Sequence, residues 1–322
     1  MSEREDALSK LTALLPERLE GEREKVAVAW SGGADSTALL LALRARVDRL
    51  VAWHIDHGWR PESHRQAQWL ARRAQEWGVA FHVARVPAAA RNREAAARQQ
   101  RYAQFARWAR EQQVRHVYLA HHVGDQAETV CMRLLQGAGV QGCCGMAVSA
   151  SREGLLLHRP WLQVAPGYLR RLLRQAHVDW IEDETNNDCT LWRNRIRHRL
   201  FPAMRRAGVE PHALFTRLQR QALRVAEELG SRVREVALEE TGEGVRVAWD
   251  SWRRLLAAER AVLLQRMLTC LFGAGTCAGR RHIELVEAWT LRGGNGGLDL
   301  SRCRVQREKS YLHLRSRQVM LR

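Results

Sequence analysis

The residues best suited to chemistry form one short turn that combines hydroxyl groups, two glycines and a carboxylate. These residues are Ser31, Gly32, Gly33, Ala34, Asp35 and Ser36. An apolar run at residues 26–30 precedes them, and a helical pattern begins at Thr37. Glycines let a backbone approach a ligand closely, and N–H groups at the start of a helix bind anions. We therefore expect this turn to bind phosphate groups, with Asp35 placed to hold Mg²⁺.

The turn lacks the lysine that a Walker loop places on phosphates, and it lacks the three spaced glycines of a dinucleotide-binding loop. Its pattern, S-G-G-A-D-S, resembles the pyrophosphate loop of the ATP pyrophosphatases, which split ATP between the α and β phosphates. Backbone donors and serine hydroxyls suit a departing pyrophosphate. An ordinary corner between a strand and a helix is the alternative.

Two carboxylates, Asp125 and Glu128, lie three residues apart in a stretch predicted to be helical. Residues at this spacing share one helix face, so both side chains can bind a cation or an amine. The same spacing suits a capping box, with Asp125 at the N-cap and Glu128 three residues later. Both hypotheses follow from the spacing.

A predicted strand ends in the sequence His54-Ile55-Asp56-His57-Gly58. We expect His54 and Gly58 to line a nucleotide site, with the glycine leaving room for adenosine. A zinc site is the alternative, although His54 and Asp56 would share one strand face while His57 lies opposite.

Glu94, Arg98 and Arg101 fall in an alanine-rich predicted helix. Taken alone they suit a solvated helix face, and Glu94 with Arg98 has the spacing of an ordinary ion pair. They gain a functional interpretation only in combination with the other segments.

An unusual polar segment spans residues 180–199. Acids and amides dominate its first half, and arginines then stand at alternate positions, namely Arg193, Arg195, Arg197 and Arg199. These four cannot all face one way on a helix, so we expect some to meet phosphates and others to pair with the acids. A surface ion-pair network is the alternative.

Strands and helices alternate along the first two-thirds of the chain. Apolar runs predict strands at residues 26–30, 50–57, 81–86, 116–120 and 155–161, the last at a sheet edge, and helices at residues 61–77, 93–112, 125–136 and 166–178. This alternation predicts an α/β fold with a doubly wound parallel sheet. Residues 31–36, 54–58 and 121–125 each follow a strand and should meet in one crevice.

The remaining residues predict a smaller α+β domain. Helical patterns cover residues 212–240, 251–272 and 279–292, and short strand patterns cover residues 245–249, 298–305 and 311–314. We expect a catalytic domain at residues 1–205 and a C-terminal domain at residues 206–322.

The 322-residue chain is strongly basic, with 52 Lys and Arg against 35 Asp and Glu and a formal net charge of +17. Nearly all of this excess is arginine, whose planar guanidinium suits phosphate, so we expect a nucleic-acid partner. The seven cysteines form no C-x-x-C pair and are expected to be free thiols. Residues 1–24 look like neither a signal peptide nor a membrane span, so we expect a cytoplasmic protein with no membrane partner.

Together these segments resemble the tRNA(Ile)-lysidine synthase family over about residues 25–202. The matching positions are residues 31–36, His54, His57, Gly58, Glu94, Arg98, Arg101, Tyr102, His121, His122, Asp125, Gln126, Glu128, Thr129, Trp180, Glu182, Asp183, Asn186, Asp188, Arg193, Asn194 and Arg197. Gly124 replaces an acid of the family's pattern, and Leu191 replaces an aromatic residue. Residues after about 210 resemble the family's first C-terminal domain more weakly, so the chain resembles a short form.

The resemblance implies an enzyme that uses ATP and Mg²⁺ to adenylate the first anticodon cytidine of the CAU-bearing tRNA(Ile), and that then joins L-lysine to C2. We assign ATP to residues 31–36, His54 and Gly58. The hypothesis for lysine places Asp125 and Glu128 on the amine with Glu94 nearby, while Arg98 or Arg101 steadies the phosphate of the adenylate. The expected tRNA contacts are Asn186, Arg193, Asn194 and Arg197.

Two rival hypotheses remain. One is a tRNA thiolase that also adenylates a base, although such enzymes usually use paired cysteines or a cluster. The other is a non-catalytic RNA-binding protein, against which the intact Asp35 argues. The sequence leaves a homodimer open.

Overall fold

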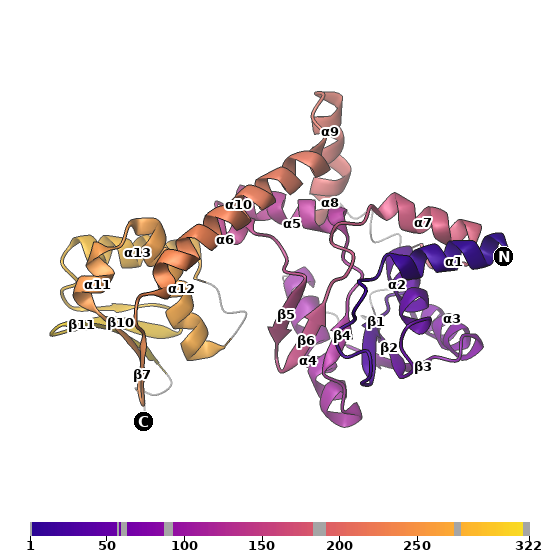
Figure 1. Ribbon diagram of the computed structural model, residues 1–322, viewed down its shortest axis with the longest axis horizontal. Coiled ribbons are helices and arrows are strands. Elements are labelled where there is room, and N and C mark those ends of the chain that lie inside the picture. Colours follow the sequence, from indigo (N-terminus) through magenta and orange to yellow (C-terminus); the bar gives the residue numbers. More distant parts are fainter. Residues whose placement is uncertain are drawn as a thin grey trace. The chain divides into compact units, whose positions relative to one another are not determined.

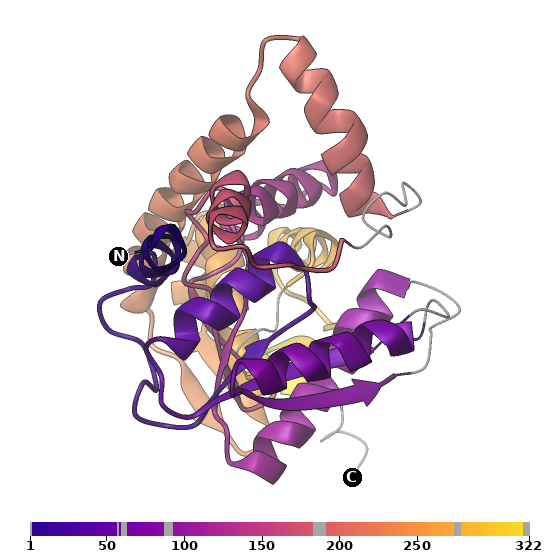
Figure 2. The same ribbon diagram turned by 90° about the vertical axis from the view of Figure 1, so that its right-hand side faces the viewer.

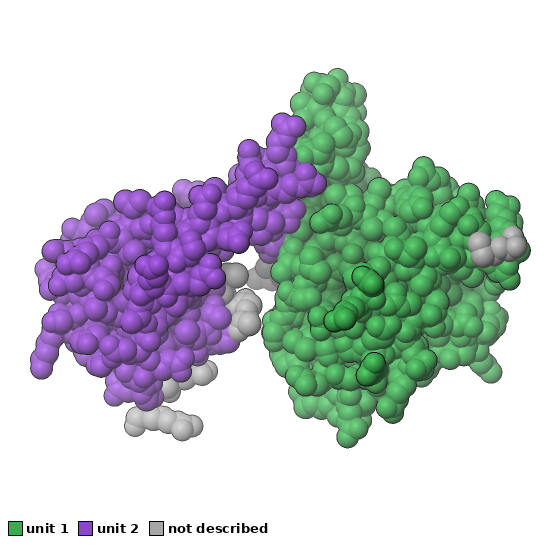
Figure 3. All heavy atoms as spheres, viewed as in Figure 1, with its two compact units in different colours: residues 1–129, 146–214 green, residues 130–145, 215–322 purple. Residues whose placement is uncertain are grey.

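The computed structural model describes residues 2–56, 58, 63–86, 93–182, 191–273 and 278–317, with the side chains of residues 93–95 outside the description (Figure 1). The chain divides into two compact units (Figure 3). The first unit comprises residues 1–129 and 146–214, and the second comprises residues 130–145 and 215–322. The expected division into a catalytic domain and a C-terminal domain at residue 205 stays a prediction.

A six-stranded sheet forms the centre of the first unit, in the order β3-β2-β1-β4-β6-β5. The strands are β1 (Val26–Ala29), β2 (Leu50–Asp56), β3 (Ala80–Arg85), β4 (His116–Tyr118), β5 (Ser149–Arg152) and β6 (Leu155–His158). Neighbouring strands are parallel except β5, which pairs antiparallel with β6. The predicted α/β fold with a parallel sheet is confirmed.

The position predicted for the strand at residues 155–161 is wrong, because β6 lies inside the sheet and β5 forms its edge. A tight turn at Glu153 and Gly154, both with positive φ, folds β5 back onto β6. None of the four residues of β5 is fully buried, so this strand carries no apolar signal in the sequence.

Helices cover both faces of this sheet, as the alternation of strands and helices predicts. The helices are α1 (Glu3–Ala13), α2 (Ala34–Arg44), α3 (Ser63–Glu76), α4 (Arg93–Gln112) and α7 (Pro166–Gln175). Figures 1 and 2 show α1 beside α7, and both helices pack against α2. Val26 and Val28 face this group, whereas Ala27 faces a second core that Tyr102, Phe105 and Trp108 of α4 complete. The alternation of β1 thus joins two cores, as expected for a sheet buried on both sides.

Two further helical stretches contribute to the site. Helix α5 (Val123–Leu135) follows β4, and a continuous helical run comprises α8 (Trp192–Arg195), a π-helical turn (Ile196–Leu200) and α9 (Phe201–Arg206). The arginine-rich half of the polar segment is therefore helical, with one wide turn inside it.

The second unit is built around an antiparallel sheet in the order β7-β8-β11-β10-β9. Its strands are β7 (Glu239–Thr241), β8 (Gly244–Ala248), β9 (Gly297–Asp299), β10 (Cys303–Glu308) and β11 (Tyr311–Ser316), and its other elements include α6 (Val140–Cys143), α11 (Trp249–Arg254), α12 (Ala257–Phe272), α13 (Arg280–Leu291) and most of α10 (Pro211–Arg234). The expected α+β composition is confirmed. Residues 212–240, 251–272 and 298–305 each form two elements where the sequence predicts one.

Across the described residues, no helix is both long enough and apolar enough to cross a membrane.

Candidate active site

The phosphate-binding turn predicted from the sequence connects β1 to α2. Gly33 occupies the N-cap and has no side chain with which to cap the helix, so N–H groups of the first turn stay available to a ligand. The hydroxyls of Ser31 and Ser36 lie 3.0 Å apart, and Ser36 also donates to the carbonyl of Gly33 at 3.0 Å. The turn therefore combines open backbone donors with two oriented hydroxyl groups, which suits an anionic ligand.

Gly32 is required at its position by both backbone and packing. Its φ is +90°, and a Cβ atom there would lie 2.8 Å from Cδ1 of Ile181 and 3.0 Å from Cδ2 of Leu70. Its carbonyl accepts hydrogen bonds from the Ile181 N–H at 2.9 Å and the Thr37 hydroxyl at 3.3 Å. The turn is thus held from outside by Ile181, which precedes the polar segment identified in the sequence.

Asp35 lies in the first turn of α2, and its two carboxylate oxygens differ in environment. Oδ2 is 3.5 Å from Nε2 of His122, while Oδ1 is buried and accepts no hydrogen bond within the described part of the chain. Mg²⁺ is commonly held by one or two carboxylates together with substrate phosphates. Oδ1 of Asp35 has no hydrogen-bond partner among the described residues and belongs to the phosphate-binding turn, so it suits such an ion.

The zinc alternative at His54 finds no support in the geometry. Nδ1 of His54 lies 2.9 Å from the carbonyl oxygen of Trp30, and burial lowers the pKa of His54, so the ring is a neutral partner of the turn. Over the described ranges no three His, Cys, Asp or Glu side chains are arranged to hold a metal, and His57 lies outside those ranges. Gly58, with φ +60°, donates its N–H to Asp56 at 2.8 Å and ends the strand beside Arg85.

Helix α5 begins two residues earlier than the sequence predicts, which changes the capping arrangement. His122 is the residue before the helix; its N–H donates to Oδ2 of Asp125 at 3.1 Å, and its Nδ1 accepts from the N–H of Asp125 at 3.2 Å. Asp125 is therefore the third helical residue and not the N-cap. Glu128 takes no part in this capping, so the capping box expected between Asp125 and Glu128 is wrong.

His122 joins the phosphate-binding turn to the acidic pair. Because Nδ1 accepts from Asp125, the proton of a neutral ring lies on Nε2 and points to Asp35. Burial favours the neutral ring, but the hydrogen bond to Asp35 and the charge of Asp125 together raise the pKa of His122. For Asp125, burial is outweighed by His122, His121 and Arg193, which lower its pKa. Asp35 and Asp125 thus act on one imidazole from opposite sides.

Two arginines of the polar segment bind Glu128, whose side chain is 4% exposed. Arg197 donates to both carboxylate oxygens, at 2.6 and 3.0 Å, and its guanidinium also lies 3.5 Å from Asp125. Nε of Arg193 lies 3.3 Å from Glu128, and its Nη2 donates to Thr129 at 2.8 Å. Burial raises the pKa of Glu128, which Arg197 opposes. Arg193 and Arg197 therefore pair with an acid inside the site, and not in the surface network that was the alternative.

The structure links the turn at residues 31–36 to Asp125 through His122, so these two predicted parts of the site meet. Asp125 and Glu128 share one helix face, as predicted, and Arg197, which was expected to contact tRNA, contacts both of them. Asn194 is buried in α8. Cζ of Arg98 lies 5.3 Å from the centre of the Tyr102 ring. The pKa of Arg101 is lowered, mainly by burial and further by the charge of Arg98. The side chain of Glu94 and all of Asn186 lie outside the described residues.

Sequence reasoning gave His122 no role of its own, although it stood within a recognised motif. The sequence could have indicated a role for His122, because it stands between the end of a strand and two acids. That position puts a titratable ring at the carboxyl edge of the sheet, where ligands bind.

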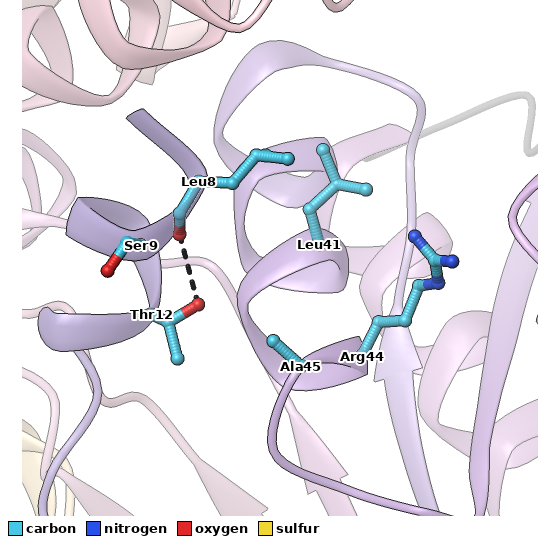
Figure 4. A pocket seen from close by; sticks show the side chains of 6 residues that line it. All are labelled: Leu8, Ser9, Thr12, Leu41, Arg44 and Ala45. Atoms are coloured by element: carbon cyan, nitrogen blue, oxygen red, sulfur yellow. Dashed lines mark hydrogen bonds between the residues drawn. The ribbon is translucent and has the colours of Figure 1, made fainter. Parts of the chain in front are cut away.

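A separate hollow of about 470 Å³ lies between α1 and α2 (Figure 4). Its lining residues are Leu8, Ser9, Thr12, Leu41, Arg44 and Ala45. It adjoins the last turn of α2, whereas the phosphate-binding turn precedes the first, so the hollow is no part of the site.

The chain is similar to several known proteins. Residues 4–204 match the family model described as PP-loop domain. The tRNA(Ile)-lysidine synthase of Bordetella bronchiseptica is 35% identical over 274 residues, which cover 81% of this chain and 80% of that protein. The enzyme of the same name from Chlamydia caviae is 39% identical over 178 residues, and the match spans little more than half of each chain, 54% of this one and 56% of the relative.

Among solved structures, the U34-tRNA thiolase NcsA from Methanococcus maripaludis, determined with its 4Fe–4S cluster, has a TM-score of 0.55. The match covers 69% of this chain and 78% of the thiolase at 14% identity, so it shows a shared fold. By the family model and the Bordetella relative together, this chain belongs to the PP-loop family and, within it, to the tRNA(Ile)-lysidine synthases.

Proposed function

We propose that this protein joins L-lysine to C2 of the wobble cytidine in the CAU-bearing tRNA(Ile), which changes decoding from AUG to AUA. In the first step the cytosine O2 attacks the α-phosphate of ATP, and pyrophosphate leaves. In the second step the ε-amine of lysine attacks C2, the C2–O2 bond breaks, and AMP leaves with that oxygen. The observation that carries the proposal is the bridge from Asp35 through His122 to Asp125, because it places a phosphate-binding turn beside a buried acidic pair.

The turn supplies what the first step needs. N–H groups at the start of α2 and the hydroxyls of Ser31 and Ser36 are oriented toward an anion before it arrives, so they stabilise charge that develops on the leaving pyrophosphate. Asp35 would hold Mg²⁺ through Oδ1, which accepts no hydrogen bond from the described residues, and the ion would neutralise phosphate charge there.

The acidic pair supplies what the second step needs. Free lysine has an ε-ammonium pKa of about 10.4, so deprotonation at pH 7 costs about 4.6 kcal/mol. A carboxylate that orients the ammonium and takes its proton removes much of this barrier. The position of Arg197, which donates to both oxygens of Glu128 and lies 3.5 Å from Asp125, supports the assignment of this role to the two acids, because a cationic group is already seated on their carboxylates. Glu94 is retained as a third acid of this group.

For tRNA we propose contacts from Asn186, Arg193, Asn194 and Arg197, with further contacts from residues 206–322. Arg197 keeps a third of its side chain exposed while it binds Glu128, so its guanidinium can share the carboxylate with an incoming phosphate. The arginine excess of the whole chain supports a polyanionic partner.

Mass analysis of the anticodon nucleoside tests the proposal. The protein is incubated with ATP, Mg²⁺, L-lysine and transcribed CAU-bearing tRNA(Ile), and the tRNA is then digested to nucleosides. We expect a cytidine heavier by one lysine minus one water, formed together with AMP, and no such product with Asp35→Asn. A product that needs ammonia or a sulfur donor in place of lysine would remove this assignment and favour a different base-adenylating enzyme.

A further inference from the structure

Four arginines surround the buried Tyr102 close to the proposed active site. Arg98 and Arg101 belong to α4, Arg152 to β5, and Arg159 directly follows β6. The Cζ atoms of Arg98 and Arg152 lie 5.3 and 4.1 Å from the centre of the tyrosine ring. Several positive charges are thus held together on one side of the sheet.

Arg159 is the most deeply buried of these side chains, at 5% exposure. Its Nη1 donates to the carbonyl of Ala147 at 2.8 Å, while its Nε is buried without a hydrogen-bond partner in the described structure. Burial is the main cause that lowers the pKa of Arg159, and the charge of Arg98 adds to it. Nη1 of this guanidinium is therefore held by a hydrogen bond, whereas its Nε has none within the described ranges.

His121 presents a second unsatisfied atom at the same sheet edge. Its Nδ1 is buried and, like Nε of Arg159, has no partner among the described residues. His121 follows β4 and Arg159 follows β6, and these neighbouring parallel strands bring the two residues to the carboxyl edge of the sheet. Burial lowers the pKa of His121 to about 3, so the ring is neutral at pH 7 and offers a hydrogen bond.

Among the described residues, acids balance the cationic group only in part, since of its four arginines Arg152 alone forms an ion pair, with Glu153 at 3.4 Å. Whereas Arg193 and Arg197 pair with Glu128, the structure, in the ranges it describes, gives Arg98, Arg101 and Arg159 no ion pair with Asp or Glu. The buried guanidinium of Arg159 is unfavourable without a counter-charge, and the nearby charge of Arg98 repels it. An anion that enters between them would remove both penalties.

We propose that Arg159 and His121 are the buried part of a phosphate-binding site that Arg98 and Arg101 complete, and that this site takes one phosphate group of a bound substrate. The planar fork of arginine fits two phosphate oxygens, and the neutral imidazole adds a third donor. The phosphate belongs either to the nucleotide or to the RNA backbone beside the reacting base. That choice of substrates rests on the proposed function, whereas the binding of phosphate does not.

Arg159→Met is the principal variant, since it removes the charge and the donors while keeping an unbranched apolar stem. Arg133→Met is the matched control, because Nη1 of Arg133 also donates to backbone carbonyls, those of Gly142 and Gly145, and lies in the second unit. Melting temperatures of both variants establish that they fold.

Equilibrium binding is then measured in two separate experiments, with ATP alone and with transcribed tRNA alone. We expect Arg159→Met to weaken one ligand by about ten- to a hundredfold and to leave the other within twofold, as for loss of a charge-assisted hydrogen bond. Weaker ATP binding assigns the nucleotide phosphate. Weaker tRNA binding, together with a fall of about 0.7 to 0.9 in the slope of log affinity against log salt, assigns an RNA phosphate. The control should bind both ligands as the wild type does.

Two milder variants decide the matter if Arg159→Met fails to fold. Arg159→Lys keeps the charge but loses the planar guanidinium, so we expect a partial loss of ligand affinity. His121→Asn keeps a donor near the position of Nδ1 and should bind the ligand almost normally. His121→Ala has no donor there and should bind it more weakly. Folded variants of Arg159 and His121→Ala that bind both ligands within twofold of wild type would overturn the site. Absence of the lysine-bearing nucleoside with the binding defects present would instead overturn only the proposed function.

Discussion

Glu128 is the residue on which the charges of the site converge. Its carboxylate is almost fully buried and is bound by Arg197 on both oxygens and approached by Arg193 on one. A lysine ammonium that reaches Asp125 and Glu128 must therefore share them with, or displace, a guanidinium. This competition makes the affinity for lysine sensitive to any change at Glu128.

Glu128→Gln should raise the KM for lysine by about ten- to a hundredfold, because a charge-assisted contact is worth about 1.5 to 3 kcal/mol. Its affinity for tRNA should change much less. Glu210→Gln is the matched control, since Glu210 is exposed and pairs with Arg205 at 3.3 Å. The measurement is incorporation of labelled lysine into tRNA at several lysine concentrations. An unchanged KM for Glu128→Gln contradicts the assignment.

At this scale the sequence predicts which residues gather but not how they pair. The three-residue spacing of Asp125 and Glu128 correctly indicates a shared face. The start of α5 at Val123 was not predictable, because His122 is a weaker capping signal than Asp125 and only the fold brings its ring to Asp35. Arg193 and Arg197 point toward α5 because the two helical segments pack together. The local sequence does not predict this packing.

Among the elements, the turn between β1 and α2 depends most on one glycine. Gly32→Ala should lower the free energy of unfolding by about 2 to 5 kcal/mol, since it combines about 1 to 2 kcal/mol for a left-handed backbone with overpacking of about 1 to 3 kcal/mol against Ile181 and Leu70. It should also weaken ATP binding, because the displaced turn carries the phosphate donors.

Gly78→Ala provides the control for that variant. Gly78 has φ +64°, yet no described atom lies within 4 Å of the position its Cβ would take. It should therefore lose about 1 to 2 kcal/mol through the backbone alone and bind ATP normally. Urea denaturation and equilibrium dialysis measure the two effects. Equal losses in both variants would show that the contacts with Ile181 and Leu70 are unimportant.

The pairing of β4 with β6 contains a titratable contact. Nδ1 of His116 and Nε2 of His158 are 2.9 Å apart, and Ser149 lies 3.1 Å from the other nitrogen of His158. Burial, followed by the neighbouring His116, lowers the pKa of His158 below its ordinary value of 6.5. The unfolded chain then takes up a proton before the folded chain does as the pH falls.

His158 should therefore stabilise the fold fully above pH 6.5 and progressively less below it. Chemical denaturation at a series of pH values should show this decline, and His158→Gln, whose amide can replace the hydrogen bonds, should make the decline shallower. Identical pH profiles for the two proteins would contradict this role.

The elements that the sequence mispredicts share a physical cause. Leu255 and Leu256 separate α11 from α12 without any glycine or proline, so the break has no local signal. Strand β5 forms because the adjacent strand offers it hydrogen bonds, and its own residues carry no apolar face. The alanine-rich composition of residues 93–112, in contrast, predicted the bounds of α4 without error.

The charge of the whole molecule, +17, predicts how it meets RNA. Affinity for tRNA should fall steeply with salt, with a slope of about 0.7 to 0.9 for each phosphate that an arginine neutralises. Affinity for ATP should fall far less over the same range. Filter binding between about 50 and 200 mM salt measures both. A tRNA affinity that does not depend on salt would contradict a role for the arginine excess.

The wide turn at Ile196–Leu200 makes this part of the chain respond differently to a lost and to a gained residue. A π-helical turn holds one residue more than an α-helical turn, so deletion of one residue between positions 198 and 200 would convert it to an ordinary α-helical turn and leave Phe201 buried. Insertion of one residue would instead rotate everything that follows by about 100°, because each residue of an α-helix rotates the next by that angle. Arg193 and Arg197 would keep their contacts with α5, while Phe201 would turn out into water. An insertion here should therefore be tolerated far less than a deletion.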